Sequence, residues 1–286
     1  MGKLTVLGGT GFIGSHLVRR LEALGFEYDA PGRDEDLRGC DLGTVLDCAG
    51  VTYDFRERPL DATEAHVCLV ERLLRESRCQ SLTYLSSVRV YRRASSPARE
   101  DDPLPLVPAD RDDLYDISKA MGESLTLWGH PQGRVVRLGH VYGADFGSDN
   151  FLPAVLREVV TTGKLTLRSA LESSRDFTSV HDVVGCLIEI ATVGRHRVYN
   201  LASGQRVTNK QLAARLNELT GCEVEVVRGA PLVSLPALSV ERVREEFDFE
   251  CSNLLEDLPE LLRLYQRHFA HPGQTQASAF GPYGAS

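Results

Sequence analysis

Tyr115 and Lys119 stand four residues apart in a segment, 115–128, whose apolar spacing predicts a helix, so both side chains should lie on one helical face. A lysine ammonium beside a phenol favours the phenolate, and such a pair can exchange a proton with a carbinol near neutral pH. Two serines, Ser86 and Ser87, end an expected strand at 81–85. Spacing of this kind is common by itself, and it gains meaning from the glycine-rich turn that precedes it in the chain.

That turn is the run GGTGFIG at 8–14, between an expected strand at 3–8 and an expected helix at 12–24. Glycine permits a tight turn and lets backbone N–H groups approach a pyrophosphate, and the helix N-terminus adds the positive end of its dipole. The placement predicts a dinucleotide site formed by Gly8, Gly11, Phe12, Ile13 and Gly14. A positive nicotinamide ring would favour the phenolate in the same way as the lysine.

The preference between NAD and NADP depends on the end of the second strand, expected at 26–30. If Gly32 occupies the selector position, Arg33 follows it and can bind a 2′-phosphate, which favours NADP(H) slightly. If the register slips by two residues, Asp34 would hold the 2′-hydroxyl of NAD. Arg33 could equally be a solvated turn residue.

The expected elements alternate between strand and helix, which favours a parallel sheet with helices on both faces. Further strands are expected at 43–49, 81–85 and 134–138, with a helix at 61–75, and a long loop rich in Pro, Asp and Arg runs to Asp113. The predicted fold is α/β, a doubly wound sheet at 1–143 to which segments near 176–202 return. A smaller substrate lobe is expected at 144–270, and the tail at 271–286 has the composition of a disordered segment.

Composition narrows the class of partner. The formal charge of −8 and pI near 5.5 argue against a nucleic-acid-binding surface, and no apolar run approaches the ~20 residues of a membrane span. We therefore expect a cytoplasmic protein with a small-molecule partner. The seven cysteines form no C-x-x-C pair and have no histidine at ligand spacing, so neither disulfides nor a metal site is expected.

Together these motifs resemble the extended short-chain dehydrogenase/reductase family, which includes nucleotide-sugar epimerases, dehydratases and reductases. The resemblance covers about 3–220 and rests on GGTGFIG, Ala49-Gly50, LSSVRVY at 85–91, YDISK at 115–119, RLGHVYG at 137–143, RDFTSVHD at 175–182 and YNL at 199–201.

The resemblance implies a role for each matching position. Ser87 would bond the reacting oxygen, Tyr115 would be the acid/base, and Lys119 would lower its pKa. Ala49, Gly50, Ser86 and Leu138 would join the cofactor site, and Arg89, His140, Asn150 and Arg175 the substrate site, where Asn150 and Arg175 would hold the diphosphate of a nucleotide. For Arg175 the alternative is a structural ion pair with Asp176 or Asp182. His66 stands where the family often has Asn and is interpreted as a plain polar core residue.

The departures from the family pattern favour one reaction. Dehydratases of this kind carry Asp-Glu after the catalytic hydroxyl residue, whereas this chain has Val88-Arg89. The chain is expected to be an NADPH-dependent 4-ketoreductase acting on a nucleotide-linked sugar in the cleft beside the lobe. An epimerase with tightly bound NAD is the close alternative, and a non-catalytic NADPH sensor or scaffold is one of another class. A homodimer is possible.

Overall fold

The computed structural model describes residues 2–52 and 54–270, so the expected disordered tail lies outside the described residues. The chain divides into two compact units. The first comprises the chain up to Val141 together with Asp176–Gln205 and Leu235–Cys251. The second comprises Tyr142–Arg175, Arg206–Ser234 and the residues from Ser252 onward.

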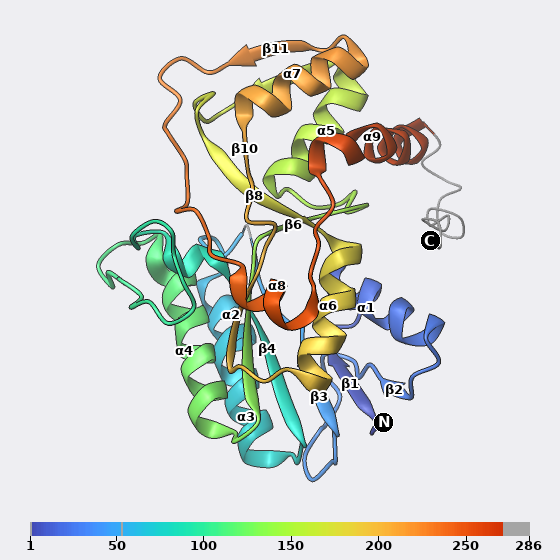
Figure 1. Ribbon diagram of the computed structural model, residues 1–286, viewed down its shortest axis with the longest axis vertical. Helices are drawn as coiled ribbons and strands as arrows, with labels where there is room; N and C mark the ends of the chain where they lie inside the picture. Colours follow the sequence, from blue (N-terminus) through green and yellow to red (C-terminus); the bar gives the residue numbers. More distant parts are fainter. Residues whose placement is uncertain (1, 53, 271–286) are drawn as a thin grey trace. The chain divides into compact units, whose positions relative to one another are not determined.

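The first unit is built on a parallel six-stranded sheet in the order β2-β1-β3-β4-β5-β9 (Figure 1). Its strands are β1 (Leu4–Leu7), β2 (Tyr28–Asp29), β3 (Thr44–Asp47), β4 (Ser81–Ser87), β5 (Gly133–Leu138) and β9 (Val198–Leu201). The order reverses beside β1, because β2 pairs with one edge of it and β3 with the other. Ligands of such sheets bind at the carboxyl ends of the strands at this reversal.

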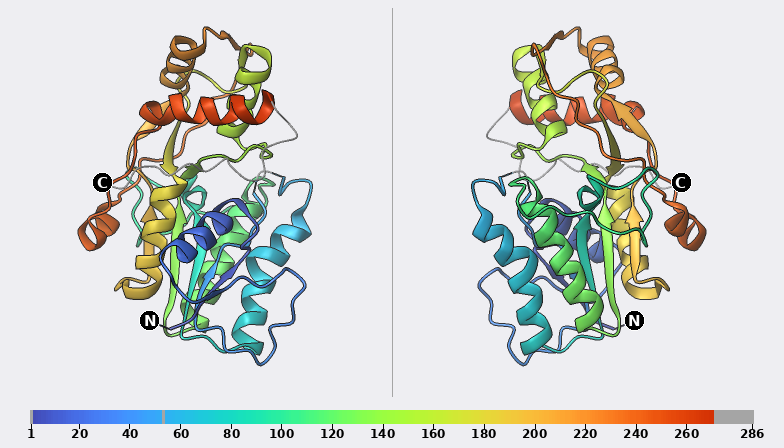
Figure 2. Two further views of the ribbon diagram at one scale, coloured as in Figure 1. Left: turned by 90° about the vertical axis from the view of Figure 1, so that its right-hand side faces the viewer. Right: turned by 90° about the vertical axis from the view of Figure 1, so that its left-hand side faces the viewer.

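Helices cover both faces of the sheet, which confirms the doubly wound fold. Helices α1 (Phe12–Ala23) and α6 (Val180–Val193) pack together on one face, and α3 (Leu69–Glu76) and α4 (Asp113–Gly129) on the other (Figure 2). Most strand residues are buried on both sides, which explains their nearly continuous apolar runs. The core contains Leu4, Leu46, Leu85, Val136 and Leu201.

The helix expected at 61–75 is a composite of three pieces. It begins as α2 (Pro59–Thr63), continues as the π-helix η1 (Glu64–Cys68) and ends as α3. A π-helical turn admits an extra residue and changes which side chains face inward, and such turns are frequent at functional sites. A short 3-10 helix, η2 (Val88–Tyr91), follows β4 directly.

The second unit contains α5 (Phe151–Thr162), α7 (Asn209–Thr220) and α9 (Leu254–Ala270), and the parallel pair β7 (Lys164–Leu167) and β11 (Glu223–Val226). Three further strands, β6 (His140–Tyr142), β8 (Ser174–Ser179) and β10 (Arg206–Thr208), form a sheet in the order β10-β8-β6. Helix α8 (Glu241–Phe247) lies in the segment 235–251, which belongs to the first unit although the sequence analysis placed it in the lobe.

Candidate active site

The glycine turn between β1 and α1 is too crowded for side chains. Gly8 has a φ of +71°, and a Cβ there would lie 2.9 Å from the amide nitrogen of Ala49. At Gly14 a Cβ would lie 2.2 Å from the carbonyl oxygen of Gly8. No side chain caps the start of α1 at Gly11, so the first N–H groups of this helix can bind an anion. The turn therefore has the shape and polarity that a dinucleotide pyrophosphate requires.

Tyr115 lies in the first turn of α4 and is only 8% exposed. The side chain of Ser87, the last residue of β4, lies close enough to act on the pKa of Tyr115. Its ring also contacts Phe55, at 5.3 Å between ring centroids, and His66, at 5.2 Å. Strand β4 and helix α4 thus bring together the two hydroxyls that the sequence analysis assigned to the reacting oxygen.

The environment of Tyr115 keeps it a phenol. Burial raises the pKa of Tyr115 to about 12, while the hydrogen bond with Ser87 acts in the opposite direction, as does the charge of Arg89. The sequence analysis expected Lys119 to lower this pKa, whereas the groups that lower it in the structure are Ser87 and Arg89, and burial outweighs them. A phenol that holds its proton is suited to donate it to a ketone.

Lys119 lies one turn further along α4 and is also buried, at 5% exposed. Its Nζ donates to the carbonyl oxygen of Leu85 at 2.9 Å and lies 3.5 Å from where a Cβ on Gly50 would be. Burial lowers the pKa of Lys119 to about 8, and the carboxylates of Asp47 and Glu123 oppose this shift. Gly50 therefore leaves room for the ammonium at the carboxyl end of the sheet.

A buried ion pair anchors α4 to the sheet below the site. Arg137, on β5, donates from Nε and Nη2 to the two carboxylate oxygens of Glu123 at 3.0 and 2.7 Å. Ser86 donates to the same carboxylate at 2.5 Å, so its hydroxyl is directed to Glu123. A cofactor contact by Ser86 would therefore be made by its backbone.

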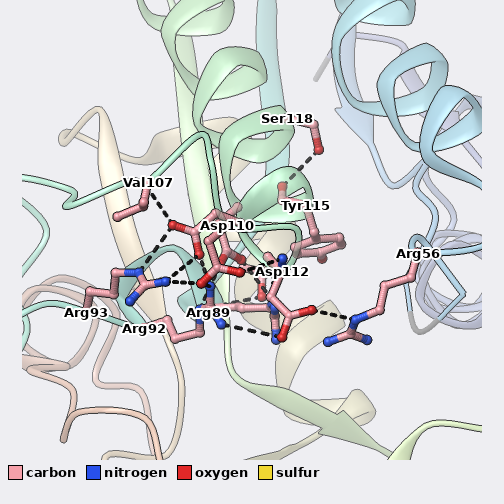
Figure 3. A network of polar contacts seen from close by, with 12 residues as sticks. Arg56, Arg89, Arg92, Arg93, Val107, Asp110, Asp112, Tyr115 and Ser118 are labelled. Carbon is pink, nitrogen blue, oxygen red and sulfur yellow. Dashed lines mark hydrogen bonds and ion pairs between the residues drawn. The ribbon is translucent and has the colours of Figure 1, made fainter.

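Arg89, two residues after Ser87, is held in a network of arginines and aspartates (Figure 3). Its Nε lies 2.9 Å from Asp116, and its Nη2 donates to the carbonyl oxygen of Asp112 at 2.8 Å. The other members are Arg56, Arg92, Arg93, Asp110 and Asp113, paired across the loop that precedes α4. The long loop of the sequence analysis is thus tied by ion pairs to the helix that carries Tyr115.

In the second unit, Arg175 lies on β8 and packs against the ring of Phe151, with 3.7 Å between its Cζ and the ring centroid. Its Nη1 donates to Asn209 Oδ1 at 3.1 Å. The carboxylate of Asp176 accepts from the backbone N–H groups of Ser203 and Gly204, at 2.8 Å each, so it is directed away from Arg175. The role of Arg175 in the substrate site stays a prediction. Burial lowers the pKa of Arg175 to about 10. Asn150 is exposed and immediately precedes α5.

The remaining predicted residues lie in varied surroundings. Arg33 is exposed in a turn after β2, and Leu138 is buried opposite Ser87 on β5. His140 is half-buried with its ring 5.7 Å from that of Phe177. Ala49 donates its amide to Asp47 Oδ1 at 3.1 Å.

Some residues near the site were not predicted from the sequence. Asp47 ends β3 fully buried, and its Oδ2 accepts no hydrogen bond from the described residues. Asp116 is buried beside Arg89. Glu123 could have been predicted, because it follows Lys119 by one helical turn in the sequence. Asp47 and Asp116 had none beyond their charge at positions that the fold buries.

Two properties of residues 2–52 and 54–270 bear on other classes of function. No group of His, Cys, Asp or Glu side chains there is arranged to hold a metal ion. None of the helices in those ranges is long and apolar enough to cross a membrane.

Comparison with known proteins shows the family. Residues 37–202 match the model of the NAD dependent epimerase/dehydratase family. A dTDP-4-dehydro-6-deoxy-D-allose reductase of Streptomyces sp is 27% identical over 315 residues, which cover 92% of this chain and 96% of that protein. A GDP-6-deoxy-D-mannose reductase of Pseudomonas aeruginosa is 28% identical over 257 residues, covering 79% and 83%.

Solved structures share the fold. MoeE5 in complex with UDP-glucose and NAD is similar with a TM-score of 0.77 and 24% identity, over 94% of this chain and 100% of that one. RMD from Pseudomonas aeruginosa complexed with NADPH has a TM-score of 0.74 and 22% identity over the same shares. These structures confirm the predicted Rossmann-like fold. The family and the named relatives confirm the predicted enzyme class, an NAD(P)-dependent oxidoreductase. The chain belongs to the NAD dependent epimerase/dehydratase family.

Proposed function

We propose that this protein is a 4-ketoreductase that uses NADPH to reduce a nucleotide-linked 4-keto sugar. The observation that carries the proposal is the buried phenol of Tyr115, placed where the side chain of Ser87 acts on its pKa, beside an Arg89 that is paired with Asp116. The reductase names of the two relatives support the same class of substrate.

In this reaction the protein's own residues carry out the proton transfer to the ketone oxygen. Ser87 orients the ketone oxygen, and Tyr115 donates the proton from its phenol as charge develops on that oxygen. Lys119, with its ammonium near Gly50, stabilises the phenolate left behind. Bound NADPH supplies the hydride. Gly8, Gly11 and Gly14 would hold its pyrophosphate, with Phe12, Ile13, Ala49, Gly50, Ser86 and Leu138 around it.

Elimination is disfavoured at this site because it needs a further acid and base near the sugar. Val88 is 2% exposed and apolar, and the Nε and Nη2 groups of Arg89 are engaged by Asp116 and Asp112. Neither residue supplies a free carboxylate. Arg89 and His140 are proposed to shape the sugar pocket.

Arg175 and Asn150 are proposed to bind the diphosphate of the nucleotide. The guanidinium of Arg175 is half-buried against the ring of Phe151, and the loss of solvation lowers its pKa. A diphosphate would supply a countercharge, and the planar fork of arginine is suited to phosphate oxygens.

The preference for NADPH rests on Arg33. The side chain is exposed in the turn after β2, near the place where a 2′-phosphate is read in folds of this kind. A location in the cytoplasm and the absence of nucleic-acid or membrane partners stay predictions.

The test is to follow 340 nm absorbance with NADPH and a panel of nucleotide-linked 4-keto sugars, and to extract cofactor from freshly purified, denatured protein. A reductase oxidises NADPH in proportion to ketone and releases its cofactor each cycle. Stoichiometric bound NAD, with inversion of a nucleotide sugar and no net use of NADPH, would establish the epimerase instead. NADPH binding without turnover of any sugar would favour the sensor.

A homodimer is proposed to form through the outer face of α4. Met121 and Trp128 lie two turns apart on this helix and are 52% and 89% exposed, and Leu60 of the adjacent α2 is 81% exposed. Met121 and Trp128 share one face of α4 by their spacing, and exposed apolar side chains that share a face mark interaction sites. A second copy would cover the same residues by two-fold symmetry.

A further inference from the structure

His66 is fully buried in the π-helix η1, at 0% exposed, and lies against Tyr115. The two rings meet edge to face, with an angle of 87° between their planes. The sequence analysis interpreted His66 as a plain core residue, and its contacts are more specific than that interpretation implies. Its backbone is fixed as well, because Tyr84 donates its hydroxyl to the His66 carbonyl oxygen at 3.2 Å.

Three hydrogen bonds run from the turn after β3 to the backbone of Tyr115. Val51 N–H donates to His66 Nε2 at 3.1 Å. His66 Nδ1 lies 2.9 Å from Ser118 Oγ, and Ser118 donates its hydroxyl to the carbonyl oxygen of Tyr115 at 2.8 Å.

The direction of each bond follows from the first. An amide N–H can only donate, so Nε2 must be the unprotonated nitrogen of a neutral ring. The ring proton is then on Nδ1 and is donated to Ser118 Oγ, which still has its own hydrogen for Tyr115. The chain of bonds is complete only with the neutral Nδ1–H tautomer. Burial and the charge of Lys119 lower the pKa of His66 to about 2, which is consistent with a neutral ring.

The chain of bonds joins two parts of the proposed reaction site. The position next to Val51 is Gly50, where a Cβ would lie 3.4 Å from His66 Nε2 and 3.5 Å from Lys119 Nζ. His66 therefore contacts the ring of the acid at one side and the turn that makes room for Lys119 at the other. The π-helical turn of η1 places this imidazole between them.

We propose that His66 is a positioning residue for Tyr115, which it orients through its ring contact and through Ser118 while it fixes the turn at Gly50-Val51. The inference rests on the proposed role of Tyr115 as the proton donor. His66 does not contact the reacting atoms by this account, and its effect on turnover passes through the orientation of the phenol.

The first test measures the bond chain without turnover. Nitrogen-15 NMR of the protein labelled at histidine should show His66 as the neutral Nδ1–H tautomer, unchanged between about pH 8 and pH 5, where a free imidazole titrates. The Val51 amide should be protected from hydrogen exchange. An Nε2–H tautomer, or a ring that titrates near its ordinary pKa, would overturn the proposal.

The second test uses kinetics of NADPH-dependent reduction. His66→Phe keeps an aromatic ring and removes both hydrogen bonds, so we expect kcat to fall by ~10- to 100-fold with less than about a threefold change in KM for NADPH. His66→Gln, which can still accept from Val51, should recover part of the loss. Ser118→Ala removes only the hydroxyl that joins His66 to the backbone of Tyr115. If His66→Phe does not fold, Ser118→Ala tests the same chain of bonds, and its kcat should also fall.

The control is His130, directly after α4, whose ring also accepts from one backbone N–H group and faces an oxygen with its other nitrogen. One of its ring nitrogens accepts from Gln132 N–H at 3.1 Å, and the other lies 3.1 Å from the carbonyl oxygen of Cys79. His130→Phe should lower stability and leave kcat unchanged. Equal kcat in His66→Phe and His130→Phe would overturn the positioning role. If the wild type reduced no sugar, the proposed function would have failed, and the NMR result would still decide the bond chain.

Discussion

The hydroxyl of Tyr115 lies in surroundings that raise its pKa. Phe55 and His66 pack against its ring, and burial raises its pKa to about 12. In the proposed reaction the acid is therefore preformed, and a ketone bound at Ser87 would meet a phenol over the whole neutral range.

Tyr115→Phe keeps the ring packing and removes the transferable proton. We expect kcat to fall by ~10²- to 10⁴-fold while the affinity for NADPH changes by less than about threefold. Tyr265→Phe, which removes a buried hydroxyl bonded to the carbonyl oxygen of Asp145, is the control and should leave kcat unchanged. A loss within about tenfold, or ~1.4 kcal/mol, is too small for the principal acid and would contradict the assignment.

Arg33→Ala tests whether Arg33 binds the 2′-phosphate of NADPH. A guanidinium–phosphate bond contributes ~1.5–3 kcal/mol, so NADPH should bind ~10- to 100-fold more weakly while NADH binding stays the same. Titration of both cofactors measures the difference. Arg38→Ala, an exposed arginine nearby that pairs with Asp36, should change neither. Equal losses of affinity for the two cofactors would show that Arg33 is a solvated turn residue and that another residue selects between NADPH and NADH.

Arg175→Ala should raise KM for a nucleotide-linked sugar by ~10- to 100-fold and change kcat by less than about threefold, because a diphosphate contact holds the ground and transition states alike. Steady-state kinetics over a range of sugar concentrations measure both constants. Arg168→Ala, an exposed arginine of the same unit, is the control. A fall in kcat with unchanged KM would assign Arg175 to the chemistry instead.

At the scale of elements, the strands and helices that carry the motifs could be predicted from the sequence. The glycine turn, the end of β4 at Ser87 and the helix with Tyr115 and Lys119 have strong local patterns, since strand period, turn residues and helical spacing agree there. The π-helix η1 could not be predicted, because nothing in the local apolar spacing distinguishes it from an α-helical turn. The role of His66 depends on that turn.

Long-range contacts account for other differences. The network around Arg89 pairs side chains up to 56 residues apart, and no local pattern indicates which aspartate meets which arginine. The segment of α8 joins the first unit through contacts such as Asn200 with Ser239, which only the folded chain brings together. The charge state of Tyr115 likewise follows from burial rather than from its spacing to Lys119.

The packing of helix α4 on the sheet depends on the buried ion pair between Arg137 and Glu123. Their side chains are 5% and 4% exposed, so Arg137→Met leaves a buried carboxylate without its partner and should lower the free energy of unfolding by ~3–5 kcal/mol. Urea denaturation measures the change. Lys164→Met breaks an exposed pair with Glu223 and should cost less than ~1 kcal/mol. A loss at Arg137 no greater than at Lys164 would show that α4 does not rely on this pair.

At the scale of the whole molecule, the proposed dimer gives a reason for apolar residues that the monomer leaves in water. Trp128 is the chain's single tryptophan and is 89% exposed. Exposure of so large an apolar side chain is unfavourable unless another surface covers it, at roughly 25 cal/mol for each Å². The helix that carries Tyr115 would then also form the contact between subunits.

Met121→Glu and Trp128→Glu place charges on that face, and a two-fold interface would bring each glutamate near the same apolar patch of the second copy. We expect light scattering coupled to size-exclusion chromatography to give a dimer for the wild type and a monomer for the double variant. Leu232→Glu, at a 68% exposed position of the second unit, should stay dimeric. A monomeric wild type, or a double variant that stays dimeric, would remove α4 as the interface. Because both changed side chains point away from the core, circular dichroism should show the fold intact, so a monomer that still reduces its sugar would separate assembly from catalysis.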